Sequence, residues 1–270
     1  MARAFRQMHF WGAGAVLTVG AVVLATELTY AKGQDDDQHY SYLGPAVAQL
    51  GDRVPPPARG PAGVAADRRV FARTRALEGS TRWKQAANDG NRSESSLMRA
   101  FSCAAGLELT PEDAPHLTSL MAAAGGDAAD VASQAKSRFR RARPYILDAG
   151  ATCRPTNRLD GFRDYPSGHS SRGWTWGLIL GELLPDRREQ LSSRAQAYAD
   201  SRVVCGLHSP TAAGAGRAVA ELTVASLMRN PNFRAELEQA SKELAALEQR
   251  AQVPPARRCL SEQAMMNRPY

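Results

Sequence analysis

The stretch PSGHSSRGWTWGLILGELLP, residues 166–185, decides the fold that this sequence predicts. Its longer part, residues 170–184, is apolar and contains Trp174 and Trp176, and Pro185 ends the run because proline does not continue a helix. The run is too short to cross a bilayer as a helix. We therefore expect a buried central helix, around which the rest of the chain packs.

Helical patterns fill most of the remaining sequence. We expect helices over residues 65–77, 82–87, 95–107, 127–141, 187–207, 216–228 and 230–250. A further helix is expected to begin near Thr110 or Asp113 and to end at Gly125-Gly126. No alternating strand pattern of useful length and no internal repeat is visible. The sequence predicts an all-α, single-domain helical bundle over residues 32–250 and a C-terminal tail over 251–270.

The N-terminus has the pattern of a secretory signal peptide. Two arginines precede the uncharged apolar run Phe10–Thr26, and small residues follow it. We expect cleavage after Ala31, with Ala25 as a second candidate position, so that residues 1–31 are removed. An uncleaved membrane anchor is the alternative. A cleaved signal predicts a periplasmic or secreted protein without a stable membrane span.

The charge is strongly positive. The full chain has a net charge of +7, and residues 1–31 contain two arginines and one glutamate, so their removal leaves +6. A basic protein favours anionic partners such as phosphate esters, nucleic acid or an acidic surface. Its content of 43% hydrophobic residues is sufficient for a folded core.

Four cysteines in an exported chain predict two disulfides, for which three pairings are possible. Cys153 and Cys205 flank the central stretch, so we favour that pair and therefore Cys103–Cys259. Free buried thiols are the alternative. No two cysteines are close enough in sequence for a zinc knuckle.

Three blocks of residues carry the chemistry, and the first is basic. Lys136, Arg140 and Arg143 fall at i, i+4 and i+7, which places them on one face of a helix. Pro144 is expected to end that helix at Arg143, so its guanidinium points into the following loop, where it can grip phosphate oxygens. A solvated basic face or a nucleic-acid patch is the alternative interpretation.

The second block is the start of the central stretch. A helix N-terminus offers free N–H groups and the positive end of its dipole to an anion. Gly168 allows close approach of the backbone, Ser167 adds a hydroxyl, and His169 can give a proton to a leaving group. A serine-capped helix with an incidental histidine is the alternative.

The third block is Ser201-Arg202 followed by His208. Arg202 can supply a second guanidinium to the anion. A neutral His208 can attack phosphorus and form a phosphohistidine. A structural histidine is the alternative for His208 alone.

Together the three blocks resemble the signature of the type 2 phosphatidic acid phosphatase superfamily. The chain is most similar to bacterial class A non-specific acid phosphatases, over roughly residues 40–245. The resemblance extends to Pro55-Pro56-Pro57 and to residues 76–91, 100–102 and 165–174. It implies an all-α fold, a periplasmic location, and hydrolysis of small phosphomonoesters without a metal or another cofactor.

The resemblance also implies residue roles and ligands. His208 would be the nucleophile and His169 the general acid. The phosphate would be held by Lys136, Arg143, Ser167, Gly168 and Arg202. Phosphate or vanadate would inhibit. Since the same pocket in related enzymes holds vanadate, a haloperoxidase is the nearest chemical rival.

One position departs from the family pattern. The family has an aspartate four residues after the nucleophilic histidine, where it orients the ring, and this chain has Ala212 there. An unoriented imidazole predicts weak activity that Ala212→Asp should raise. Alternatively, another acid reaches His208, for which we consider Asp160, Asp164, Asp200 and Glu221.

Three other functions compete with an acid phosphatase. The first is a phosphate-binding homologue with impaired turnover, which the departure at position 212 motivates. The second is a membrane lipid phosphatase, which is disfavoured because only residues 10–26 approach the length of a span. The third is nucleic-acid binding through the basic face, which we rank last. A homodimer is left open.

Overall fold

The computed structural model describes residues 40–57 and 60–266, and every regular element in these two ranges is helical. The all-α prediction is confirmed. The elements are α1 (Ala46–Arg53), α2 (Pro61–Arg75), α3 (Thr81–Asn88), α4 (Glu94–Ala105), α5 (Pro115–Phe139), α6 (Pro144–Leu147), α7 (Gly168–Leu183), the 3₁₀ turn η1 (Pro185–Arg187), α8 (Arg188–Val204), α9 (Pro210–Leu227), α10 (Pro231–Gln249) and α11 (Ala256–Met266). The segment expected to be a signal peptide lies outside the described residues.

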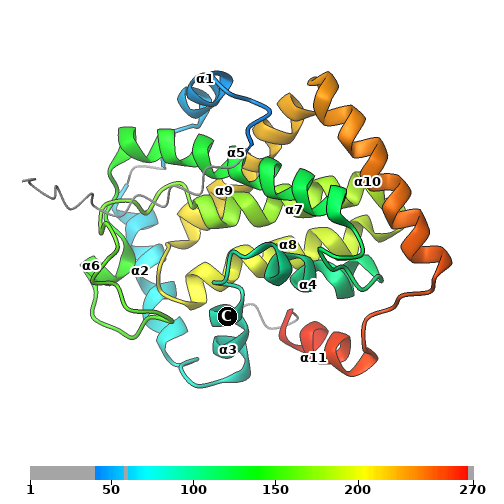
Figure 1. Cartoon of the computed structure of the whole chain (residues 1–270). Coiled ribbons are helices and arrows are strands. Elements are labelled where there is room, and N and C mark those ends of the chain that lie inside the picture. The colour runs from blue at the N-terminus through cyan, green and yellow to red at the C-terminus, as the bar shows by residue number, and fades with distance from the viewer. Residues whose placement is uncertain (1–39, 58–59, 267–270) are drawn as a thin grey trace, which may run out of the picture. The chain divides into compact units, whose positions relative to one another are not determined.

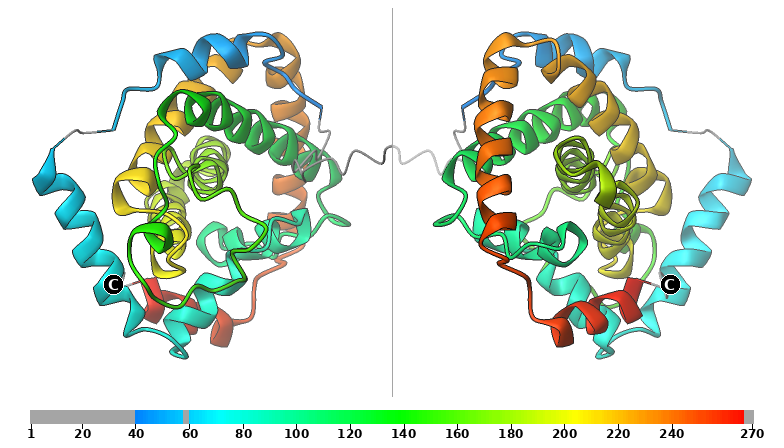
Figure 2. Two further views of the ribbon diagram at one scale, coloured as in Figure 1. Left: turned by 90° about the vertical axis from the view of Figure 1, so that its left-hand side faces the viewer. Right: turned by 90° about the vertical axis from the view of Figure 1, so that its right-hand side faces the viewer.

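Helix α7 is the central element, as the sequence predicts. It packs against α5, α8 and α9 (Figure 1), and Figure 2 shows it nearly end-on with these helices around it. Trp176 and Ile179 on α7 are completely buried. Burial of large apolar side chains on this helix contributes about 1.5–3 kcal/mol each to folding.

Two glycines bring α7 close to α8. A Cβ added at Gly173 would lie 2.2 Å from Cδ1 of Tyr198, and one added at Gly177 would lie 2.6 Å from Cβ of Ala195. Neither position has room for a larger side chain. The close approach holds α8, which carries Ser201 and Arg202 of the third block, against α7, which begins at the second block.

The prediction that a helix ends at Gly125-Gly126 is wrong. Helix α5 continues through both glycines to Phe139. A Cβ at Gly125 would lie 2.9 Å from Cγ of Arg172 and 3.0 Å from Nε1 of Trp176. Glycine at position 125 therefore allows α7 to approach α5, and the surrounding packing keeps the helix intact.

Helix α9 begins at Pro210, six residues before the expected start at 216. Ser209 caps it by accepting from the backbone N–H of Ala212 at 3.1 Å, and proline suits the first helical position. The backbone N–H of Ser167 donates to the carbonyl oxygen of Ala212 at 3.0 Å. The N-termini of α7 and α9 therefore meet.

Both disulfides form with the favoured pairing, Cys103–Cys259 and Cys153–Cys205. The first joins α4 to α11. The C-terminal segment expected to be a tail therefore contains a helix that is covalently held to the bundle. The second joins the loop between α6 and α7 to the C-terminal end of α8, which precedes His208.

Candidate active site

The two cations of the first block lie on either side of the end of α5. Lys136 is in the last turn of α5, and Arg143 immediately precedes α6. Both residues are buried, with 9% and 8% of their surface exposed. Arg143 donates from Nε to the carbonyl oxygen of Asp160 at 2.9 Å and from Nη1 to that of Leu207 at 2.8 Å. Its guanidinium is thereby fixed between the loop and the third block.

The prediction that Lys136, Arg140 and Arg143 share one helical face is wrong. Helix α5 ends at Phe139, and Arg140 adopts the left-handed conformation with φ of 43°. Its side chain is exposed. Arg143 reaches the same interior region as Lys136 because the chain turns after Phe139.

Arg202 joins these two cations. It is on α8 and only 5% exposed. Among the described residues, no carboxylate lies within ion-pairing distance of Lys136 or Arg202, and Nε of Arg202 has no hydrogen-bond partner. Burial, followed by repulsion from Arg143, Arg163 and Arg202, lowers the pKa of Lys136 to about 7. Such a cluster of buried, uncompensated positive charge favours an anionic ligand.

The N-terminus of α7 adds hydrogen-bond donors. Oγ of Ser167 accepts from the backbone N–H of Ser170 at 3.2 Å and from its hydroxyl at 2.9 Å. The hydroxyl proton of Ser167 is therefore free to donate to an anion. A Cβ at Gly168 would have no neighbour nearer than 3.6 Å, so the protein's own packing does not require glycine there. Glycine leaves space for a ligand at the helix N-terminus.

His208 is 6% exposed and is held from both sides. Its Nε2 lies 3.0 Å from Nη1 of Arg143, and its Nδ1 lies 2.7 Å from the carbonyl oxygen of Asp164. A guanidinium can only donate and a carbonyl can only accept. Nδ1 therefore carries the proton, and the lone pair of Nε2 accepts from Nη1 of Arg143.

Several charges keep this imidazole neutral. Burial is the largest cause that lowers the pKa of His208 well below its usual value, and repulsion from Arg143, Lys136 and Arg202 follows. A neutral imidazole with its Nε2 lone pair beside the cation cluster is the form that attacks phosphorus.

His169 packs against α8, the helix that carries Arg202. Its ring stacks on that of Tyr198, with centroids 4.6 Å apart and an interplanar angle of 4°. Nε2 lies 2.6 Å from the carbonyl oxygen of Asp89, so Nε2 carries a proton, and Nδ1 is the nitrogen that can gain and lose one. Burial and then the charge of Arg202 lower the pKa of His169 well below its usual value.

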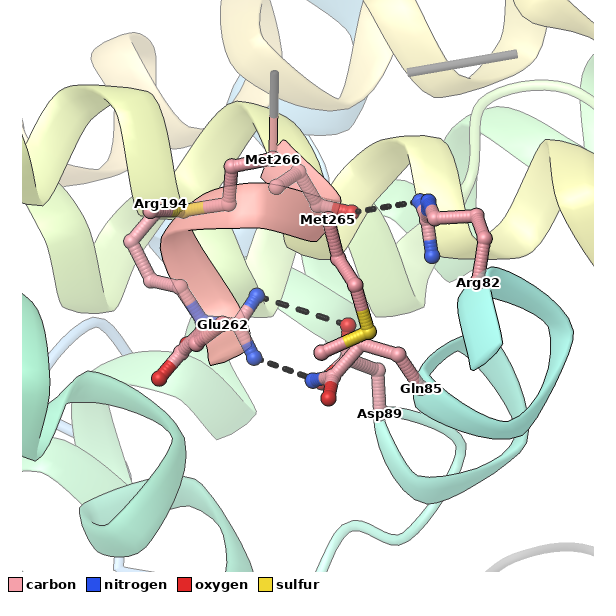
Figure 3. Close-up of a pocket in the computed structure, with 8 residues that line it drawn as sticks. Arg82, Gln85, Asp89, Arg194, Glu262, Met265 and Met266 are labelled. Atoms are coloured by element: carbon pink, nitrogen blue, oxygen red, sulfur yellow. Dashed lines mark hydrogen bonds and ion pairs between the residues drawn. The ribbon is translucent and has the colours of Figure 1, made fainter. Parts of the chain in front are cut away.

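A buried polar network holds Asp89 in place behind His169. Its carboxylate accepts from Nη2 of Arg194 and from the hydroxyl of Ser201, both at 2.5 Å. Glu262 of α11 pairs with the same Arg194. Figure 3 shows Asp89, Arg194 and Glu262 around a small pocket that is lined in part by α11. The C-terminal helix thus contributes to the support of His169.

The structure also distinguishes among the four acids considered as partners of His208. The carboxylate of Asp164 lies 3.3 Å from Nδ1 of His208, in addition to the backbone contact. The carboxylate of Asp160 accepts from the N–H of Phe162. The other two bond to residues on their own helices and not to His208. Asp200 accepts from Gln196, and the exposed Glu221 pairs with Arg217. Only Asp164 reaches the ring.

Sequence reasoning missed two supporting residues. Asp89 lies in the expected turn after the helix over residues 82–87, where acidic residues are ordinary. Arg141 lies between Arg140 and Arg143 in a basic stretch of sequence, yet it ion-pairs with Asp67 at 2.6 Å and lies 3.6 Å from the carboxylate of Asp164. No local pattern marks either, because their partners are far away in sequence.

Comparison with known proteins places the chain in a family. The model of the PAP2 superfamily matches residues 116–236, which include the three blocks. The chain is 36% identical over 213 residues to "Acid phosphatase" of Zymomonas mobilis subsp. mobilis, covering 78% of this chain and 81% of the relative. It is 34% identical over 214 residues to "Non-specific acid phosphatase" of Providencia stuartii, covering 78% and 86%.

A third relative is "Non-specific acid phosphatase" of Salmonella typhimurium, with 35% identity over 196 residues that cover 70% of this chain and 77% of the relative. The chain belongs to the PAP2 superfamily, in the group of the bacterial non-specific acid phosphatases. Within the described ranges, no helix is long and apolar enough to cross a membrane. In the same ranges, no three His, Cys, Asp or Glu side chains are grouped to hold a metal ion.

Arg143→Ala tests the cation cluster. We expect phosphate or vanadate to bind more weakly by about 1.5–3 kcal/mol, the value of a hydrogen bond to a charged group. Inhibition constants measure the change. Arg140→Ala is the matched control, because Arg140 is exposed and outside the cluster. Equal inhibition of the Arg143 variant and wild type would remove Arg143 from the site.

Proposed function

We propose that this protein is an acid phosphatase that hydrolyses small phosphomonoesters through a phosphohistidine intermediate. The arrangement around His208 carries the proposal. Its Nε2 lone pair lies against the guanidinium of Arg143, in a cluster of buried cations that includes Lys136 and Arg202. The names of the relatives agree with this activity.

In the first half-reaction, Nε2 of His208 forms a bond to phosphorus as the bond from phosphorus to the leaving oxygen breaks. The proton on Nδ1 stays in place, so the imidazole becomes positively charged. Lys136, Arg143, Arg202 and the N-terminus of α7 neutralise the phosphoryl oxygens. Nη1 of Arg143 exchanges its bond to Nε2 for one to a phosphoryl oxygen, which frees the lone pair that attacks.

His169 handles the proton on the leaving group. A proton on its Nδ1 passes to the leaving oxygen, while Nε2 keeps its bond to Asp89. Water then attacks phosphorus and returns a proton to Nδ1. The bond between nitrogen and phosphorus breaks, its electron pair returns to His208, and inorganic phosphate leaves.

A bound phosphate also increases the protonated fraction of His169, which is the form that can donate a proton. In the empty site, burial and Arg202 lower the pKa of His169. A dianion beside the ring raises it again, because opposite charges favour the protonated form. Protonation of His169 is then coupled to substrate binding, which favours turnover at acid pH.

The alternative function is a phosphate-binding homologue with impaired turnover. It was based on the expectation that the imidazole of His208 has no partner to orient it. The bond from Nδ1 of His208 to the carbonyl oxygen of Asp164 supplies such a partner and so argues against impaired turnover. Hydrolysis of a chromogenic aryl phosphate at acid pH, with phosphate as inhibitor, separates the two functions. Turnover supports the phosphatase, whereas phosphate binding without turnover supports the alternative.

The pKa of Lys136 predicts how kcat/KM changes at neutral and higher pH. Its pKa of about 7 means that it is charged below neutrality and loses its charge as the pH rises through 7. Anion binding weakens as that charge is lost, so kcat/KM should fall above neutral pH. Lys136→Arg keeps the charge, so the ratio of wild-type to variant kcat/KM should decrease above pH 7. A pH-independent ratio would contradict this assignment.

We also propose export to the periplasm or the medium. The N-terminal pattern of residues 1–31 and the two disulfides support it, since disulfides persist in oxidising compartments. Mass spectrometry of the exported protein reads the mature N-terminus directly. We expect it near Lys32, and an intact Met1 would count against cleavage.

A further inference from the structure

The carboxylate of Asp164 is completely buried, and among the described residues its polar contacts are with His208, Ser209 and Arg141. Its Oδ1 accepts from the backbone N–H of Ser209 at 2.9 Å, and its Oδ2 accepts from the Ser209 hydroxyl at 2.7 Å. Oδ1 also lies 3.3 Å from Nδ1 of His208. A loop residue that precedes the second block thus holds the nucleophile of the third.

The same residue offers two different groups to His208. The carbonyl oxygen, at 2.7 Å, accepts the Nδ1 proton and thereby fixes the tautomer and the ring orientation. The carboxylate lies slightly farther away and carries charge. The carbonyl is sufficient to hold a neutral ring, whereas only the carboxylate can balance a positive one.

The charges around His208 show why a negative group is needed. Lys136, Arg143 and Arg202 all disfavour a positive imidazole. Phosphorylation of Nε2 creates that positive charge, with Nδ1 still protonated. Among the described residues, the carboxylate of Asp164 is the negative group in contact with the ring.

Further contacts hold this carboxylate in place and favour its ionised form. Nη1 of Arg141 lies 3.6 Å from its Oδ2 and 3.2 Å from the hydroxyl of Ser209. Nη2 of Arg141 ion-pairs with Asp67 of α2, which also accepts from the N–H and hydroxyl of Thr211. Burial raises the pKa of Asp164, whereas Ser209 and Arg141 oppose that rise. Helix α2 and the start of α9 thus support the carboxylate.

We propose that Asp164 is the positioning residue of His208, and that its carboxylate stabilises the cationic phosphohistidine in place of an aspartate at position 212. The inference rests on the proposed function. It relocates the orienting acid from α9 to the loop before α7, where its backbone and side chain act on one imidazole.

Asp164→Asn is the direct test, because asparagine keeps the shape and removes the charge. The amide oxygen can accept from the N–H of Ser209, and the amide nitrogen can donate to its hydroxyl. The backbone carbonyl that holds His208 is unaffected. We expect kcat on an aryl phosphate to fall by about 10²–10³-fold, the scale of losing one preorganised electrostatic contact. The inhibition constant for inorganic phosphate should stay within about 3-fold.

Asp200→Asn is the matched control. Asp200 is also a buried carboxylate, at 6% exposure, but its partner is Gln196 rather than His208. The kcat of the Asp200→Asn variant should equal that of wild type. Thermal unfolding of the Asp164→Asn and Asp200→Asn variants shows whether each is folded. If kcat of Asp164→Asn stays within about 3-fold of wild type, the carbonyl alone suffices and the proposal is wrong. A parallel loss of phosphate affinity also overturns it, since the carboxylate would then shape the anion site.

A second measurement needs no turnover. The Nδ1 proton of His208, observed by NMR in the phosphate-bound protein, should move upfield in Asp164→Asn and stay unchanged in Asp200→Asn. An unchanged resonance in the Asp164 variant overturns the proposal. Failure of wild type to hydrolyse aryl phosphates would instead count against the phosphatase, and this resonance would still report the contact.

Discussion

His208→Ala should lower kcat on an aryl phosphate by roughly 10⁴-fold or more, because removal of a covalent nucleophile leaves only binding and electrostatic stabilisation. Inorganic phosphate should still bind, since Lys136 and Arg202 remain. The variant should also fail to form a phosphoenzyme. In wild type we expect phosphorus NMR to detect this intermediate after the reaction is stopped without acid. The truncation leaves the carbonyl oxygen of Asp164 without its partner, at a stability cost of about 1–3 kcal/mol.

His116→Ala is the matched control for this experiment. His116 lies in the first turn of α5 with a side chain that is 59% exposed, and its Nδ1 lies 3.8 Å from the carboxylate of Glu236. The polar contacts of the His116 ring and backbone N–H are with Glu236 and Glu243 of α10, outside the three blocks that form the site, so kcat should not change. A His208 variant that keeps activity within tenfold of wild type, and still forms a phosphoenzyme, would exclude His208 as the nucleophile.

Ala212→Asp should destabilise the protein by about 3–5 kcal/mol, the scale of an uncompensated buried charge. Ala212 is completely buried and belongs to the apolar core. Its backbone N–H and the carboxylate of Asp164 share the hydroxyl of Ser209, so a second carboxylate would lie near the first. The sequence alone predicts that this substitution raises activity. Because Asp164 already contacts Nδ1 of His208, we now expect no such gain. Urea denaturation measures the loss.

Two further variants sharpen this prediction. Gly214→Asp is the control, because position 214 is exposed and a Cβ there has no neighbour within 4 Å. Its stability should be close to that of wild type. The double variant of Asp164→Asn with Ala212→Asp should be more stable than the Ala212 single variant, because one of the two negative charges is gone. Faster turnover by Ala212→Asp than by wild type would show that His208 lacks a working partner.

The sequence determined the features that depend on neighbouring residues. The apolar run before Pro185 predicted the central helix α7, and the cap and first-turn proline at Asn230-Pro231 predicted the start of α10. Such signals act through local backbone geometry, so they are readable without a structure. The blocks that contain Arg143, His169 and His208 were equally visible, because the motifs are short and contiguous.

Only the tertiary structure decided the features that depend on distant partners. The helix break expected at Gly125 does not occur, because that glycine packs against α7. Arg140 lies outside the cation cluster, because α5 ends one residue before it. His169 bonds to Asp89 and His208 to Asp164, across 80 and 44 residues of sequence. Spacing along the chain cannot rank contacts of this kind, since packing of α7, α8 and α9 brings the partners together.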